Sequence, residues 1–259
     1  MPRLPRIWAP GIAICKIEDH VTALKANLER LEDAISAACR AARRSRNEIE
    51  LMAVSKTFSA ETIAEAAALG LSLFGENRVQ EFESKVPALG PKRQSMECHM
   101  IGHLQSNKAA RAAELFDGID SLDSLRLAER LNEAAGRYGK RLPVLIEVKL
   151  SPEETKTGLA PESAEAAQLL EALPGFENLL ARGLMTIAPW DAAEEVTHAC
   201  FRSLRAWRDR WAAAHPNLHL DVLSMGMSGD FPLAIAEGAT RIRVGTALFG
   251  ARKPPSERN

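Results

Sequence analysis

Residues 50–77, ELMAVSKTFSAETIAEAAALGLSLFGEN, decide the fold, because they contain one complete strand–helix–strand unit. The opening apolar run, ELMAVSK, predicts a short buried strand. The middle stretch, SAETIAEAAALG, predicts a helix with Ser59 or Thr57 as its N-cap and Gly70 as its stop signal. The closing stretch, LSLFGEN, predicts a second strand that enters a loop. Alternating strands and helices of this kind are typical of α/β proteins.

The same alternation continues to the end of the chain. Further strands are predicted in CHMIGHL (98–104), FDGIDSL (116–122), LPVLIEVKL (142–150), NLLARGLMTI (178–187), LHLDVLSMG (218–226) and ATRIRVG (239–245). Each has a helical stretch after it, and an amphipathic helix at about 19–44 precedes the first unit. Eight such units with no Gly/Ser-rich linker predict a single closed (β/α)8 barrel of the TIM type, with an extra N-terminal helix. An open doubly wound sheet is the weaker alternative, because no Gly-rich dinucleotide fingerprint follows the first strand.

Composition and charge exclude several classes of protein. The chain has 259 residues, of which 46% are apolar and 26% charged, as in an ordinary globular protein. Its 33 basic and 34 acidic residues give a net charge of −1, so we expect neither a nucleic-acid nor a membrane partner. No apolar run approaches the roughly 20 residues that span a bilayer. The four cysteines are scattered without a CxxC pair, which predicts reduced thiols in a cytoplasmic protein.

The two ends of the chain are predicted to lie outside the barrel. Residues 1–18 combine two early arginines with a short apolar stretch, but Pro10 interrupts that stretch and no small-residue cleavage pattern follows. We therefore interpret 1–18 as an N-terminal arm and not as an export signal. The barrel is predicted to occupy 19–252, and 253–259 form a polar tail. No second domain is expected after the barrel.

Lys56 is the strongest candidate for a residue that reacts with a ligand. It closes the first apolar strand, and functional groups of such barrels collect at the carboxyl ends of the strands. A lysine amine is protonated at neutral pH, but desolvation or a cationic neighbour lowers its pKa and frees it to form a Schiff base with a carbonyl. The alternative is a lysine that extends its amine into solvent from a strand end. Position alone does not decide between the two.

Two neighbouring loops predict a phosphate site. Ser224, Gly226 and Ser228 lie in LSMGMSGD at the end of the seventh strand, and Gly245 and Thr246 close the eighth. Loops in these positions often hold a phosphate in barrel proteins, through backbone N–H groups and hydroxyls. The alternative is a pair of ordinary turns with capping residues.

Arginine and histidine side chains complete the candidates. Arg243 precedes Gly245 in the last strand, and because a buried arginine needs a partner, either a ring nitrogen of a cofactor or a carboxylate such as Glu76 would serve. His99 and His103 lie four residues apart, but on a strand and its loop and without an accompanying glutamate. We therefore interpret them as satisfied or solvent-facing histidines, and no metal site is predicted.

Seven blocks, taken in order, resemble the pyridoxal phosphate homeostasis protein family, the YggS/PROSC-like proteins. They are VSKT (54–57), FGENRVQE (74–81), HMIGHLQSNK (99–108), KTGL (156–159), RGLMTI (182–187), LSMGMSGD (223–230) and RVGTALFGAR (243–252). The resemblance extends from about Asp19 to Arg252 and implies a barrel like the N-terminal domain of alanine racemase. The family pattern FGENYVQE has tyrosine where this chain has Arg78, so no role is carried over to that residue.

The resemblance also implies a cofactor and its ligands. Lys56 would carry pyridoxal 5′-phosphate (PLP) as a Schiff base. Ser224, Gly245 and Thr246 correspond to the positions that bind the phosphate, Arg243 to the arginine that faces the pyridine nitrogen, and Asn77 to a position beside the cofactor. Whether Lys156, in the TKTG segment, also contacts PLP is left open.

Two functions compete on this basis: a PLP enzyme such as an amino-acid racemase or decarboxylase, and a protein that stores PLP or delivers it, with apo PLP enzymes as candidate partners. PLP enzymes commonly hold the pyridine nitrogen with an acidic partner, whereas an arginine stays charged and cannot accept its proton. The sole tyrosine, Tyr138, is predicted in a helix far from the mouth, and no second domain would cover the site or form a dimer. We therefore expect a monomeric carrier without catalytic residues. A phosphate-binding barrel isomerase without PLP is a third alternative.

Overall fold

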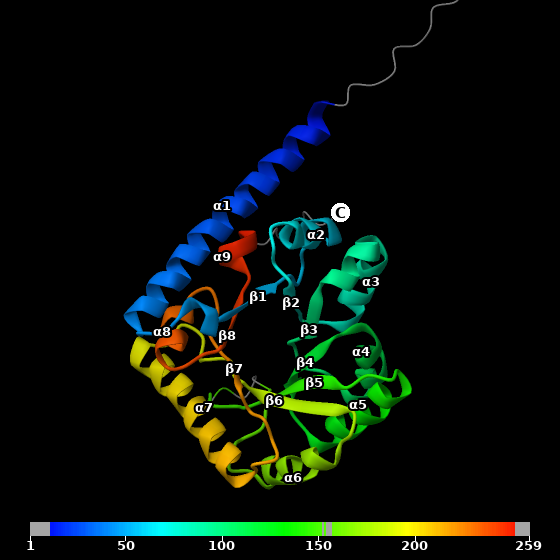
Figure 1. Cartoon of the computed structure of the whole chain (residues 1–259), viewed down its shortest axis with the longest axis vertical. Coiled ribbons are helices and arrows are strands. Elements are labelled where there is room, and N and C mark those ends of the chain that lie inside the picture. The colour runs from blue at the N-terminus through cyan, green and yellow to red at the C-terminus, as the bar shows by residue number, and fades with distance from the viewer. Residues whose placement is uncertain (1–10, 152, 154–156, 252–259) are drawn as a thin grey trace, which may run out of the picture.

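The computed structural model describes residues 11–151, 153 and 157–251, which form a closed barrel of parallel strands. The strands are β1 (Glu50–Val54), β2 (Leu73–Glu76), β3 (Glu97–Met100), β4 (Gly118–Leu122), β5 (Leu142–Glu147), β6 (Leu179–Met185), β7 (Val222–Ser224) and β8 (Arg241–Val244). They follow one another around the barrel in chain order, and β8 closes it by pairing with β1 (Figure 1). The (β/α)8 barrel that the sequence predicts is thereby confirmed.

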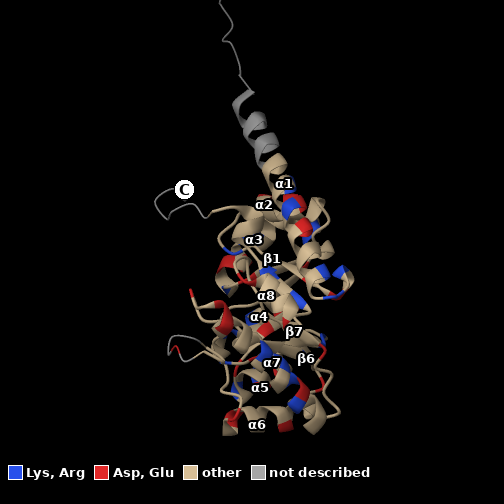
Figure 2. Ribbon diagram, turned by 90° about the vertical axis from the view of Figure 1, so that its left-hand side faces the viewer, with Lys and Arg blue, Asp and Glu red and all other residues tan. Residues whose placement is uncertain are grey.

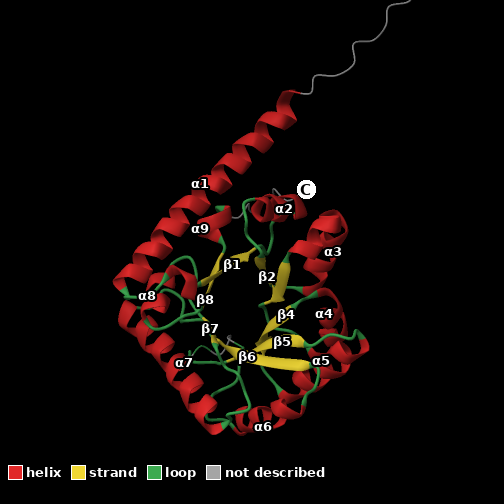
Figure 3. Ribbon diagram, viewed as in Figure 1, coloured by secondary structure: helices red, strands yellow, loops and turns green. Residues whose placement is uncertain are grey.

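Helices form the outer layer around the strands (Figure 3). They are α2 (Ala60–Ala68), α3 (Val79–Leu89), α4 (Ala109–Leu115), α5 (Leu125–Arg137), α6 (Ala164–Ala172), α7 (Glu194–Ala214), α8 (Phe231–Ala236) and the short α9 (Thr246–Phe249). Ser59, Ser124 and Ser163 each accept a hydrogen bond from the backbone N–H three residues on, which caps α2, α5 and α6. Of the two N-caps considered for α2, the structure selects Ser59.

The additional N-terminal helix, α1 (Gly11–Ala41), lies outside the barrel against α8 and α9 (Figure 1). Its buried side chains include Leu24, Leu31 and Ile35, whose spacing puts them on one face. The helix begins directly after Pro10 and not near Asp19, so residues 11–18, which we assigned to an arm, are helical. The division into arm, barrel and tail stays a prediction, and the tail at 253–259 lies outside the described residues.

The two ends of the barrel differ in character, and we call the end at the carboxyl termini of the strands the mouth and the opposite end the base. Each βα loop returns the chain from the mouth, so residues that follow a strand gather there. In the described part of the chain no helix is both long enough and apolar enough to cross a membrane. Basic and acidic residues both occur on the helices visible from the side (Figure 2).

Candidate functional site at the mouth of the barrel

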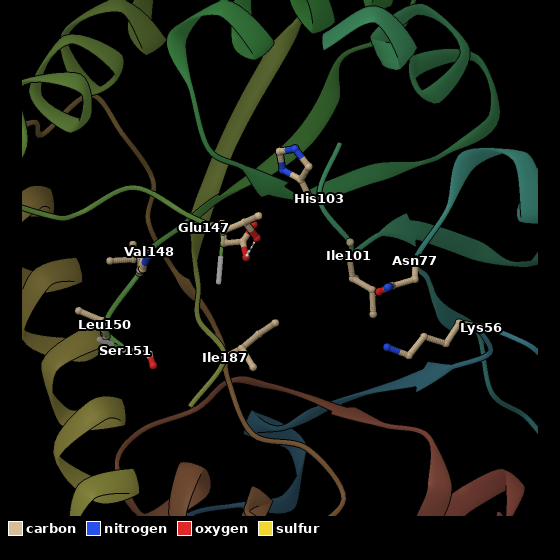
Figure 4. A pocket seen from close by; sticks show the side chains of 12 residues that line it. Lys56, Asn77, Ile101, His103, Glu147, Val148, Leu150, Ser151 and Ile187 are labelled. Carbon is tan, nitrogen blue, oxygen red and sulfur yellow. Dashed lines mark hydrogen bonds between the residues drawn. The ribbon is translucent and has the colours of Figure 1, made fainter. Parts of the chain in front are cut away.

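A pocket of about 310 Å³ opens at the mouth, between loops from opposite sides of the barrel. Its lining comprises Lys56, Asn77, Ile101, Gly102, His103, Glu147, Val148, Lys149, Leu150, Ser151, Thr157 and Ile187. Lys56 and Asn77 reach into it from the ends of β1 and β2, and Glu147 faces them from the end of β5 (Figure 4). The sequence analysis predicted the first pair but did not single out Glu147.

Lys56 is held by a network on both sides of its backbone, which we call the Lys85 network. The Lys85 ammonium donates to both carboxylate oxygens of Glu76, at 2.8 and 3.0 Å, and to the carbonyl oxygen of Ser55, at 3.2 Å. It also pairs with Glu81 at 2.8 Å. The Ser55 hydroxyl donates to Glu76 at 2.7 Å, while Glu81 accepts the backbone N–H of Thr57. Ser55, before Lys56, is therefore fixed to the end of β2 and to α3, and Thr57, after it, is fixed to α3.

The backbone next to Lys56 is strained. Thr57 has a φ of 72°, in the left-handed region, and its side chain is exposed. A β-branched residue seldom adopts this conformation, and it persists only where the surroundings impose it. The hydrogen bond from its N–H group to Glu81 is one such constraint. The strain and the Lys85 network together set the direction in which the Lys56 side chain leaves the strand.

Asn77 is held in place by the absence of a side chain at Gly102. A Cβ atom at Gly102 would lie 2.4 Å from the carbonyl oxygen of Asn77 and 2.9 Å from its Cγ. The loop after β3 therefore packs directly on Asn77 only because residue 102 is glycine. This contact keeps the Asn77 amide on the pocket wall, on the same side as Lys56 (Figure 4).

The predicted phosphate and ring contacts lie beside this pocket, on the adjacent strands β7 and β8. Ser224 and Arg243 are buried, and Arg243 donates to the Ser224 hydroxyl at 2.9 Å and to the carbonyl oxygen of Thr186 at 2.8 Å. A carbon placed at the Cβ position of Gly245 would be 3.4 Å from the carbonyl oxygen of Val54, so this loop borders the end of β1. These residues are not part of the pocket lining given above, and their roles toward a ligand stay predictions.

One suggested partner of Arg243 is wrong. Glu76 accepts hydrogen bonds from Lys85 and Ser55 and lies in the Lys85 network, not against Arg243. The reason is local, since α3 begins three residues after β2 and brings Lys85 over the strand end. Burial raises the pKa of Glu76, although the charge of Lys85 opposes this effect.

The two histidines are separated by the barrel. His99 is buried and contacts Asp120 and Glu97 at 2.7 and 2.8 Å, on the side of the base. His103 is half-exposed at the rim of the mouth and pairs with Asp123 at 2.9 Å. Both have carboxylate partners, which confirms their interpretation as satisfied histidines. Lys156 lies outside the described residues.

Glu147 is the site residue that the sequence analysis missed. Its side chain is only 4% exposed, and its Oε1 accepts a hydrogen bond from the Thr157 hydroxyl at 2.9 Å. Burial raises the pKa of this carboxyl. The sequence did contain a signal for Glu147, because this charged residue closes the apolar run LPVLI just as Lys56 closes LMAVS. The strand end alone, however, does not reveal that the two side chains face each other.

Comparison with known proteins places this geometry in context. The family model for the N-terminal domain of alanine racemase matches residues 22–253. The pyridoxal phosphate homeostasis protein of Haemophilus influenzae is 40% identical over 234 residues, covering 90% of this chain and 98% of that protein. The Escherichia coli protein of the same name is 43% identical over 230 residues, covering 87% and 95%.

Solved structures give the same relationship. PipY of Synechococcus elongatus, determined with PLP bound, matches with a TM-score of 0.74 and 43% identity, over 83% of this chain and all of that one. Alanine racemase of Clostridium difficile matches with a TM-score of 0.68 but 15% identity, over 92% of this chain and 58% of that enzyme. The second match shows a shared fold alone.

Proposed function

We propose a function from one premise: the chain belongs to the alanine racemase N-terminal domain family and, within it, to the pyridoxal phosphate homeostasis proteins. It binds PLP and serves vitamin B6 homeostasis, and Lys56 holds the cofactor as a Schiff base. The observation that carries this proposal is the primary amine of Lys56, which points into the mouth pocket from a backbone fixed on both sides (Figure 4).

The side chains around Lys56 fit the chemistry of PLP. The cofactor combines an aldehyde with a phosphate dianion and a pyridine ring, and when bound it supplies a carbonyl carbon that reacts with amines. Lys56 would provide the amine, and the Asn77 amide, which lines the same pocket, would border the ring. Hydroxyl and backbone groups at Ser224, Gly245 and Thr246 suit the phosphate, since anions bind well to backbone N–H groups and hydroxyls.

The surroundings of Arg243 support a carrier over an enzyme. Its two guanidinium nitrogens Nη1 and Nη2 donate to neutral oxygens, a hydroxyl and a carbonyl. Burial lowers the pKa of this guanidinium, but arginine remains a donor and cannot take the proton of a pyridine nitrogen. A ring that faces Arg243 would stay unprotonated and would withdraw electrons less strongly.

Tyr138, the sole tyrosine, is exposed at the end of α5 and donates to Glu114, away from the pocket. Apo PLP enzymes are the partners that we expect to receive the cofactor.

Spectral titration with PLP tests the assignment of Lys56. We expect a visible absorbance band as PLP is added to the purified protein, and after borohydride reduction one PLP attached at Lys56 by peptide mass spectrometry. The variant Lys56→Ala should lose both signals. Lys149→Ala is the matched control, because Lys149 lines the same pocket and should leave trapping at Lys56 intact.

Three results would overturn the proposal. These results are a wild-type protein without a visible band at saturating PLP, a Lys56→Ala variant that traps as much PLP as the wild type, and a label found at Lys149. Sustained amino-acid racemisation or decarboxylation at ordinary enzymatic rates would instead refute the carrier role and leave PLP binding in place.

A further inference from the structure

Glu147 carries a polar atom that the protein itself leaves unsatisfied. Among the buried side-chain nitrogen and oxygen atoms of the described residues, one lacks a hydrogen-bond partner, and it is Oε2 of Glu147. The other oxygen, Oε1, accepts from Thr157, which fixes the plane of the carboxylate. Burying such an acceptor without a donor costs about 1–3 kcal/mol, and more for a charged group. An oxygen left unpaired in the wall of a ligand pocket indicates a donor that arrives with a ligand.

The position of Glu147 restricts that donor. The carboxylate lies across the pocket from Lys56, with open space between the two side chains (Figure 4). Among the neighbouring charges, His103 is already paired with Asp123. A divalent metal ion would need several oxygen or nitrogen ligands together, and no cluster of three or more such residues occurs among the described residues. A single buried carboxylate is instead well matched to one ammonium group, because a charge-assisted hydrogen bond is short and strong.

We propose that Glu147 binds the ammonium group of a small primary amine, such as an amino acid, and accepts its proton. The inference rests on the proposed function, because the amine then meets a carbonyl carbon held by Lys56. The neutral amine would form a carbon–nitrogen bond to that carbon while the bond to Nζ of Lys56 breaks. The two protons of the amine would pass to Nζ, and the proton held by Glu147 would return this lysine to its ammonium form. One ammonium group is thereby exchanged for another, the Glu147 carboxylate is restored, and PLP would leave the protein joined to the amine. Burial raises the pKa of Glu147, which makes it a better proton acceptor than an exposed carboxylate.

Release of PLP by amines tests the proposal. The PLP-loaded protein is mixed with methylammonium chloride or glycine, and the loss of the visible band gives the release rate. Tetramethylammonium chloride is the control, because it has the same charge but no N–H group and cannot replace lysine. We expect release to saturate with methylammonium in the wild type. In Glu147→Gln, an isosteric change that keeps an acceptor for Thr157, the rate should fall about tenfold and rise linearly with amine, since one charge-assisted hydrogen bond is lost.

A second readout requires no cofactor. In the apo-protein labelled with ¹³C at glutamate carboxyls, bound methylammonium should shift the titration of Glu147 to lower pH, because a nearby cation stabilises the carboxylate. Tetramethylammonium should not. Asp123→Asn is the matched variant, because Asp123 is a neighbouring carboxylate whose charge also acts on Glu147. In this variant the rate of PLP release should still saturate with methylammonium.

The outcomes separate this inference from the proposed function. If Glu147→Gln binds PLP at Lys56 and releases it to methylammonium as the wild type does, Glu147 is not the amine site. Equal falls in the release rate in Glu147→Gln and Asp123→Asn would also refute the amine site, because the effect would then come from the general electrostatics of the pocket. A wild-type protein without a visible band would refute the proposed function itself.

Discussion

The two ends of the barrel contain similar side chains but use them differently. A pocket of about 380 Å³ at the base has six ionisable residues in its lining: Arg182 and a group of five in mutual contact, Glu50, Glu97, His99, Asp120 and Arg241. Four contacts link them: His99 to Asp120 at 2.7 Å and to Glu97 at 2.8 Å, and Arg241 to Glu50 at 2.6 Å and to Asp120 at 3.0 Å. We call this group the base cluster. Every member of it has a partner of opposite charge.

The mouth pocket, by contrast, keeps a polar atom unpaired and a backbone residue strained. Glu147 has one oxygen without a donor, and Thr57 adopts a left-handed conformation next to Lys56. In a (β/α)8 barrel the base contributes to stability and the mouth to function. The difference shows how this division arises physically: the charges of the base cluster satisfy one another, whereas at the mouth the Lys85 network fixes the backbone beside Lys56 and Glu147 keeps one oxygen for a ligand.

Removing Asp120 should have the largest effect on stability. This carboxylate bridges His99 and Arg241, and the Asp120→Ala variant would leave both cations buried without it. Breaking one partner out of a buried ion network costs roughly 3–5 kcal/mol. We expect a loss of this size in the free energy of unfolding by urea, with unchanged PLP affinity of the folded protein. Asp120→Asn gives a milder version should the alanine variant fail to fold.

Glu50→Ala is the control for that experiment. Glu50 also contacts Arg241, but its side chain is half-exposed, so its loss should cost about 1 kcal/mol or less. Equal losses in the two variants would mean that burial does not set the stability of the base cluster. A large fall in PLP affinity in Asp120→Ala would mean that the base cluster also affects ligand binding at the mouth.

The sequence predicts the local features of the molecule but not the contacts between residues far apart in the chain. The barrel was predictable because strand and helix patterns are local. Lys56 was predictable because it lies just after a strand, and Asn77 was predictable from the family resemblance. The base cluster was not, since His99 and Arg241 are 142 residues apart and meet only when the barrel closes. The unpaired oxygen of Glu147 was equally hidden, because it depends on which neighbours fail to reach it. The pairing of Glu76 with Lys85 instead of Arg243 required the position of α3 on the strand end.

Raising the pH should weaken the base more than the mouth. Burial lowers the pKa of His99, but the charge and hydrogen bond of Asp120 and the hydrogen bond to Glu97 raise it to about 9. An unfolded histidine has a pKa of about 6.5, so the protonated form stabilises the fold. This contribution is complete below pH 6.5 and is lost as the pH rises through about 9.

We therefore expect the free energy of unfolding to fall by on the order of 2 kcal/mol between pH 7 and pH 10. Urea unfolding at a series of pH values measures this fall. His99→Gln should lack most of it, whereas His103→Gln, at the rim of the mouth, should retain it. A fall of the same size in His99→Gln would assign the pH dependence to other groups.

The strain at Thr57 offers the smallest and most specific test. Glycine adopts a positive φ without a steric penalty but is more flexible when unfolded, so Thr57→Gly should stabilise the protein by only about 0.5–1 kcal/mol. Arg43 has a φ of 56° in the turn after α1, and Arg43→Gly should give a similar gain. The two should differ in PLP binding, measured by spectral titration. Only Thr57→Gly loosens the backbone beside Lys56, so only that variant should bind PLP several times more weakly. Unchanged affinity in Thr57→Gly would show that the strain is a property of the turn and no part of the site.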